Sequence, residues 1–202
     1  MPSRREGPVA GILLAAGTAS RMGNNKMLLP LDGESVLRRA ARRALAGGLS
    51  PLIVVLGHES DKALKEIEDL PCQGALNPLY QEGVNSSVKA GILAVPREAL
   101  GAMVMLADMP FVTSGMIAAM IERYRASEAP LVISDYAGVN APPMLYDRSL
   151  FTELLTMTGE GCGRQVVRRH RDEAEVLAWP ESALADLDIP EDYERAKAEG
   201  GH

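Results

Sequence analysis

The sequence predicts an α/β fold: a single domain with a doubly wound, mostly parallel sheet covered by helices on both faces, in three α/β/α layers. Short segments that are apolar at nearly every position alternate with longer segments of helical periodicity. Strands that are apolar throughout are typical of parallel sheets, because both faces of such a sheet are buried. The chain of 202 residues is long enough for one substantial core, and no linker, repeat or low-complexity segment divides it.

The first elements set this pattern. Residues 9–16 are all small or apolar and predict a buried strand. Residues 35–45, rich in Ala, Leu and Arg, predict a helix that the Gly47-Gly48 pair ends. Residues 52–56 predict a second buried strand, because they consist of Leu, Ile and Val alone.

The next elements repeat the alternation of helix and strand. Residues 61–70 predict an amphipathic helix closed by Pro71, and a weak strand follows at 73–76. Residues 86–95 predict another helix and 102–107 another apolar strand. The remaining predictions are a helix at 113–125, strands at 131–134, 143–146 and 175–178, and helices at 150–157, 164–170 and 190–198.

The composition excludes several classes of function. Hydrophobic residues make up 47% of the chain and the net charge is −6, so nothing favours binding to nucleic acid or to an anionic membrane. No apolar run is long enough to span a bilayer and the polar N-terminus is unlike a signal peptide, so we expect a cytoplasmic protein. Cys72 and Cys162 show neither disulfide-framework nor zinc-site spacing.

The segment after the first strand has the features of a phosphate-binding loop. Ala15, Ala16 and Gly17 allow backbone N–H groups to approach an anion closely, and Arg21 and Lys26 bring positive charge to the same place. The segment is neither a P-loop nor a G-x-G-x-x-G dinucleotide-binding motif. On these residues alone, an ordinary surface loop is an equally good interpretation.

Four further arginines follow this loop. Arg38, Arg39, Arg42 and Arg43 make the local field basic, which suits a small anionic ligand. Their helical spacing favours a simpler interpretation, in which all four lie on the solvent-exposed face of the helix at 35–45.

Two aspartates are candidate magnesium ligands. Asp108 follows a buried strand and has apolar neighbours on both sides, so we expect its charge to point into a cleft. Asp188 supplies a second carboxylate from the C-terminal segment, and one or two carboxylates with phosphate oxygens suit Mg²⁺. Each aspartate is also compatible with a turn or a helix cap.

The ordered run Leu14-Ala-Ala-Gly-Thr-Ala-Ser-Arg-Met-Gly, followed by Lys26, resembles the signature of the MobA-like NTP transferases. Its Leu-Ala-Ala-Gly start is most similar to the branch of the molybdenum cofactor cytidylyltransferases (MocA type). Leu106-Ala-Asp-Met-Pro resembles the family's metal-binding segment, and Asp186-Leu-Asp-Ile-Pro-Glu-Asp a second one in which Ile189 replaces Thr. The resemblance implies a fold like that of the nucleotide-diphospho-sugar transferases, which is Rossmann-like.

The resemblance also implies an activity: transfer of CMP from CTP to the molybdenum-bearing molybdopterin, with Mg²⁺ as cofactor and release of pyrophosphate. It implies a nucleotide-binding part at about 8–125 and an acceptor-side part at about 126–199. The implied catalytic residues are Arg21, Lys26 and Asp108, and the implied metal ligands are Asp108 and Asp188. The implied nucleotide-binding residues are Leu14, Ala15, Ala16, Gly17, Thr18, Arg21, Lys26, Gly57, Ser86, Ser87 and Gly91. Ser86 and Ser87 are equally compatible with a helix cap.

The acceptor side departs from the family pattern. Gly138-Val-Asn-Ala-Pro-Pro and Thr158-Gly-Glu-Gly-Cys-Gly-Arg lack a histidine and a lysine that the family usually carries there. Asn140, Pro143 and Arg164 are the predicted acceptor-binding residues. The alternatives are GTP as the donor, a sugar or alcohol phosphate as the acceptor, or a non-catalytic module that delivers the cofactor. A molybdenum hydroxylase or its chaperone is the expected protein partner.

Overall fold

In the computed structural model, which describes residues 5–17, 25–159, 161–185, 187 and 192–194, a seven-stranded sheet forms the centre. Within that part of the chain, β8 runs antiparallel to its neighbours and the other six strands are parallel to one another. Their order in space is β5 (Cys72–Leu76), β4 (Leu52–Leu56), β1 (Val9–Ala15), β6 (Gly101–Leu106), β8 (Val139–Asp147), β7 (Leu131–Tyr136) and β9 (Glu175–Trp179).

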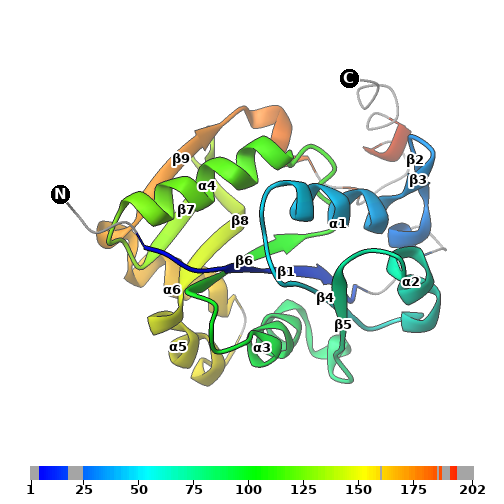
Figure 1. Ribbon diagram of the computed structural model, residues 1–202, viewed down its shortest axis with the longest axis horizontal. Helices are drawn as coiled ribbons and strands as arrows, with labels where there is room; N and C mark the ends of the chain where they lie inside the picture. Colours follow the sequence, from blue (N-terminus) through cyan, green and yellow to red (C-terminus); the bar gives the residue numbers. More distant parts are fainter. Residues whose placement is uncertain (1–4, 18–24, 160, 186, 188–191, 195–202) are drawn as a thin grey trace.

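Helices cover both faces of the sheet (Figure 1). Along β1, Leu13 faces one layer and Ile12 the other, and both are fully buried because successive side chains of a strand point to opposite faces. The layer on the Leu13 face contains α1 (Val36–Ala46), α2 (Ser60–Ile67) and α4 (Ser114–Ala126), and the layer on the Ile12 face contains α3 (Val84–Ala94), α5 (Phe151–Thr156) and α6 (Cys162–Arg169). The predicted three-layer, doubly wound fold is confirmed.

A small hairpin that the sequence analysis treated as loop precedes α1. It pairs β2 (Pro30–Leu31) with β3 (Glu34–Ser35) around Asp32 and Gly33, which both have positive φ. Two central residues with positive φ are typical of a type I′ turn, and this turn holds two strands that are too short to show a periodicity. The Asp32 carboxylate pairs with Arg39 at 2.6 Å and so fixes the hairpin to α1.

A second hairpin makes β8 longer than the predicted strand at 143–146. Ala137 and Gly138 form its turn, with φ values of 53° and 94°. β8 therefore starts at Val139, directly after the turn. The sequence does not predict this tight turn because alanine rarely adopts positive φ.

The other predicted elements differ at their ends by a few residues. α3 starts at Val84 rather than at 86, and none of Asn85, Ser86 and Ser87 acts as its cap, because Gly83 occupies the N-cap position. Of the helix predicted at 190–198, the structure describes residues 192–194, which are helical. Five short 3₁₀ helices complete the described elements: η1 (Lys26–Leu28), η2 (Tyr80–Glu82), η3 (Arg148–Leu150), η4 (Arg171–Glu173) and η5 (Glu181–Leu184).

None of the helices in the described part of the chain combines the length and the apolar character that crossing a membrane requires.

Candidate active site

The parallel strands end together at one edge of the sheet, which we call the carboxyl edge. Ala15 of β1 pairs with Leu56 of β4, and Leu14 of β1 pairs with Leu106 of β6. The loops after β1, β4 and β6 therefore leave the sheet side by side, which is where open α/β sheets bind ligands. Because β8 is antiparallel, it is its beginning, near Val139, that lies at this edge.

Lys26 is held rigidly at the carboxyl edge. It opens η1, and the side chain of Asn25 caps this short helix by accepting from the Met27 amide at 3.1 Å. The Met27 side chain is buried in the core, and the Asn25 amide also donates to the His58 carbonyl, after β4, at 3.5 Å. These contacts fix the start of the lysine side chain without using its charge.

Asp108 meets Lys26 there. Its Oδ2 lies 2.5 Å from Lys26 Nζ, and both side chains keep less than one fifth of their surface exposed. Two backbone contacts hold the loop: the Ala107 amide donates to the Leu14 carbonyl, and the Leu187 amide donates to the Asp108 carbonyl, both at 3.1 Å. The structure thus brings together two of the three predicted catalytic residues.

The rest of the predicted phosphate loop is described in part. The side chains of Leu14, Ala15 and Ala16 are buried, so only their backbone is able to meet a ligand. Gly17 is exposed, and a Cβ added there would meet no atom within 4 Å. Thr18 and Arg21 lie outside the described residues, as does Asp188.

Ser86 and Ser87 are held in place by Asn77, the residue that follows β5. The buried Asn77 amide donates to Ser86 Oγ at 2.9 Å and to Ser87 Oγ at 3.0 Å. Ser86 Oγ lies 2.8 Å from the carbonyls of Leu79 and Gly83, to which it donates. The serines therefore connect the end of β5 with the first turn of α3, and the Asn-Pro pair followed by Ser-Ser was the signal for this connection.

Two predicted nucleotide-binding glycines have packing reasons of their own. A Cβ on Gly57 would lie 2.6 Å from the Tyr80 ring, and a Cβ on Gly91 would lie 2.3 Å from Ile12. Gly91 thus allows α3 to approach β1 closely. A role in binding nucleotide stays a prediction for both.

The predicted acceptor residues lie in two places. Asn140 is at the beginning of β8 and hence at the carboxyl edge, whereas Pro143 is in the middle of β8, next to Met144, which pairs with Val104 of β6. The Asn140 amide donates to Asp135 at 2.9 Å and its oxygen accepts from Arg171 at 3.0 Å, while the Pro143 carbonyl accepts from Ser134 at 2.7 Å.

The third acceptor residue, Arg164, is exposed in the first turn of α6. The loop before it reaches α3, because Asn85 donates to the Gly159 carbonyl at 2.6 Å and Lys89 to the Met157 carbonyl at 2.7 Å. The first turn of α3 follows β5 closely, so this loop approaches the nucleotide-binding part from the acceptor side.

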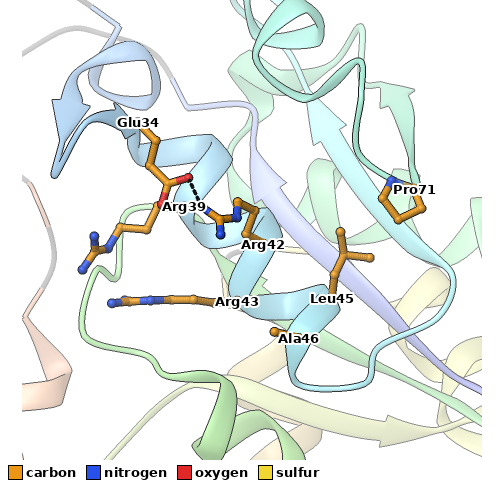
Figure 2. A pocket seen from close by; sticks show the side chains of 7 residues that line it. All are labelled: Glu34, Arg39, Arg42, Arg43, Leu45, Ala46 and Pro71. Atoms are coloured by element: carbon orange, nitrogen blue, oxygen red, sulfur yellow. Dashed lines mark hydrogen bonds and ion pairs between the residues drawn. The ribbon is translucent and has the colours of Figure 1, made fainter. Parts of the chain in front are cut away.

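A groove of about 580 Å³ lies along α1, and neither Lys26 nor Asp108 is among the residues that line it (Figure 2). Its cations are engaged by the protein: Arg42 pairs with Glu34 at 3.1 Å, and Arg43 donates to backbone carbonyls. The interpretation of the four arginines as one exposed face holds only for Arg42. Arg38, Arg39 and Arg43 are partly buried, Arg39 in its pair with Asp32 and Arg43 because it reaches the loop after β6. Burial, together with the charge of Arg39, lowers the pKa of Arg43.

The metal-binding capacity of the described residues rests on Asp108. Among them, no group of three or more His, Cys, Asp or Glu side chains is arranged to hold a metal ion. A single carboxylate beside a phosphate site nevertheless fits Mg²⁺ or Mn²⁺, since hard cations take oxygen ligands and keep several waters.

A family model described as the MobA-like NTP transferase domain matches residues 11–174. The chain belongs to this family. The predicted membership is confirmed, and the chain is a nucleotidyltransferase of that family. The match includes Lys26, Asp108 and the acceptor segments, so the site described above lies inside the family's domain.

Two relatives of this MobA-like protein match most of its length. The purine catabolism protein PucB of Bacillus subtilis is 28% identical over 93% of this chain and 95% of its own length. Nicotine blue oxidoreductase of Paenarthrobacter nicotinovorans is 28% identical over 81% of this chain and 82% of its own. These relatives support assignment to the MocA-type branch of the family.

Solved structures agree on the fold. Rv0371c of Mycobacterium tuberculosis H37Rv superimposes with a TM-score of 0.85 at 25% identity, covering 96% of this chain and 99% of its own. A complex of Rv0371c with manganese has a TM-score of 0.78 at 24% identity, covering 95% of this chain and 99% of its own.

Proposed function

We propose that this MobA-like protein transfers CMP from CTP to the phosphate of molybdenum-bearing molybdopterin and releases pyrophosphate. The observation that carries the proposal is the contact of Lys26 with Asp108, 2.5 Å apart at the carboxyl edge. The two residues come from the loops after β1 and β6, and a cation paired with a carboxylate at this place suits a nucleoside triphosphate with its metal.

The triphosphate is bound by charge and by backbone. Lys26, with Arg21 from the same loop, binds the phosphate oxygens, and the exposed backbone at Gly17 donates to them. Gly57, Ser86 and Ser87 face the nucleoside, with the serine hydroxyls held in place by Asn77. We propose CTP as the nucleotide donor because the family signature in this chain begins with Leu14-Ala-Ala-Gly.

Asp108 and Asp188 are the proposed ligands of Mg²⁺. Leu187, the residue before Asp188, is hydrogen-bonded to Asp108, which supports the placing of both carboxylates on one ion. When bound, Mg²⁺ supplies positive charge to the phosphates and lowers their repulsion of an incoming anion. Until it binds, Lys26 neutralises the Asp108 carboxylate.

The transfer itself needs no covalent intermediate on the protein. A phosphate oxygen of the acceptor attacks the α-phosphorus of CTP, and the bond to the β-phosphate oxygen breaks in line with it. The products are the acceptor linked to CMP through a new phosphoanhydride bond, and pyrophosphate. Lys26 and Arg21 offset the charge that develops on the leaving pyrophosphate, so the protein contributes by positioning and electrostatics.

The acceptor lies on the side of residues 126–199. Asn140 and Pro143 of β8, and Arg164 at the start of α6, are its proposed contacts, with Arg164 binding an acidic group. The Asn140 amide is already engaged by Asp135 and Arg171, which supports a role in shaping the hairpin that faces the acceptor.

The test is to incubate the protein and Mg²⁺ with CTP or GTP and with candidate phosphates, and to identify products by mass spectrometry. We expect a CMP adduct of molybdopterin and an equal amount of pyrophosphate. A GMP adduct, or an adduct of a sugar or alcohol phosphate, would replace the proposed substrates but keep the reaction type. Tight binding of the finished cofactor without pyrophosphate release would instead indicate a delivery module for a molybdenum hydroxylase.

A further inference from the structure

Arg43 is one of four arginines of α1 to which the proposed reaction gives no role. It lies near the end of the helix, and its side chain extends with that of Arg39 away from Leu45 and Pro71 (Figure 2). Its neighbours on the same helix have other partners, since Arg38 pairs with Asp69 and Arg42 with Glu34.

The guanidinium group of Arg43 binds the backbone of the loop that carries Asp108. Its Nη1 donates to the Pro110 carbonyl and, at 3.3 Å, to the Val112 carbonyl. The loop runs from the end of β6 to Thr113, the N-cap of α4, and Met109 and Val112 bury their side chains in the core. The guanidinium of Arg43 thus donates to two carbonyls, both within four residues of the candidate metal ligand Asp108.

The position of Asp108 is therefore set from three sides. The Ala107 amide fixes the loop to β1 and the Leu187 amide fixes the Asp108 carbonyl, while Arg43 holds the part after Asp108. Without Arg43, the Pro110 and Val112 carbonyls lose a charged donor, and such hydrogen bonds are stronger than neutral ones.

The surroundings of Arg43 argue against a role as a phosphate ligand. The Pro110 and Val112 carbonyls already accept from its Nη1, and the acids nearby, Asp32 and Glu34, pair with Arg39 and Arg42. Arginine remains charged even when it is partly buried, so its donors need fixed acceptors, and the two loop carbonyls provide them.

We propose that Arg43 is a positioning residue: by donating hydrogen bonds to the carbonyls of Pro110 and Val112, it holds Asp108 at the place where its carboxylate meets Lys26. The inference rests on the proposed function for its catalytic consequence. Its structural part concerns only the geometry of the loop that carries Asp108, so the structural and the catalytic effects are measured separately.

The test compares Arg43→Met, which keeps the apolar stem and removes the donors, with Arg43→Lys and with Arg42→Met as the matched control on the same helix. In Arg43→Met we expect faster amide hydrogen exchange in residues 107–113. We also expect a fall of about 10- to 100-fold in kcat for pyrophosphate release with an unchanged KM for CTP, and a higher Mg²⁺ requirement. Arg43→Lys restores part of the rate, and Arg42→Met behaves as the wild type.

Unchanged exchange at 107–113 in a folded Arg43→Met protein overturns the positioning role, as does an unchanged kcat beside an active wild type. If Arg43→Met does not fold, the folded Arg43→Lys protein decides by the same two readouts. A wild type that releases no pyrophosphate from any nucleotide overturns the proposed function, while the exchange comparison still supports or overturns the loop-holding role.

Discussion

The nucleotide-binding and acceptor-side parts of this MobA-like protein use their polar groups differently. At the ends of β1 and β6, Lys26 and Asp108 pair directly at the edge where a ligand would enter. Around β8, the Asn140 amide is engaged on both sides by Asp135 and Arg171, and Arg164 extends from α6 into solvent. We propose on this basis that the first part determines the reaction type and the second the choice of acceptor.

The close packing of α3 against β1 can be tested at Gly91. An added Cβ would lie 2.3 Å from Ile12, so Gly91→Ala forces α3 and β1 apart. We expect a loss of about 1–3 kcal/mol in the free energy of unfolding, measured by urea denaturation.

The matched control is Gly115→Ala in α4, where the nearest atom to an added Cβ is 3.7 Å away. This change should leave stability unchanged or raise it, because alanine favours a helix. Equal stability of the two variants would contradict the packing role of Gly91.

The acceptor-side part is tested at Arg164. Arg164→Gln removes a charge from the proposed acceptor site without touching Lys26 or Asp108. We expect KM for the acceptor to rise about tenfold, the equivalent of about 1.4 kcal/mol, while KM for CTP stays the same. Arg168→Gln, an exposed change one helical turn further along α6, is the control and should change neither constant. A rise in KM for CTP in Arg164→Gln would break the division of roles between the two parts.

A smaller effect concerns Asp147, at the end of β8 that lies opposite the carboxyl edge. Burial alone would raise its pKa, but hydrogen bonds from Tyr124 and Ser149 and the charge of Arg5 outweigh burial and hold the pKa below its ordinary value. A lowered pKa stabilises the fold at pH values above the ordinary carboxyl range, and the stabilisation is lost as the pH falls through the folded-state pKa.

Asp147→Asn should therefore lower the free energy of unfolding by about 1 kcal/mol near neutral pH and flatten its decline in acid. The measurement is urea denaturation at a series of pH values, with the exposed Glu128→Gln as the charge-matched control. The same acid dependence in wild type and Asp147→Asn would contradict this assignment.

The sequence predicted the layers and the alternation of strands and helices, because buried parallel strands such as β1 and β4 carry an unbroken apolar signal. It missed the β2–β3 hairpin and the tight turn between β7 and β8, which depend on the backbone of Asp32 and Ala137 at positive φ. Side-chain type alone does not specify such a conformation.

The candidate site was predictable where a motif carries the chemistry, as at Lys26 and Asp108. The contacts of Asn77 with Ser86 and Ser87 were not predictable, because they depend on how β5 meets α3. The sequence did not distinguish Arg43 from the exposed Arg42, since helical periodicity does not tell how far a long side chain reaches across to another loop.

The assignment of Lys26 and Asp108 to the active site is tested most directly by Mg²⁺-dependent release of pyrophosphate from CTP in the presence of acceptor. The proteins to compare are wild type, Lys26→Met, Asp108→Asn and the double variant. We expect each single variant to fold and its rate of pyrophosphate release to fall at least about 100-fold. Because the two side chains touch, the double variant should lose less than the product of the two single losses. A single variant that keeps the wild-type rate would contradict the assignment of this site.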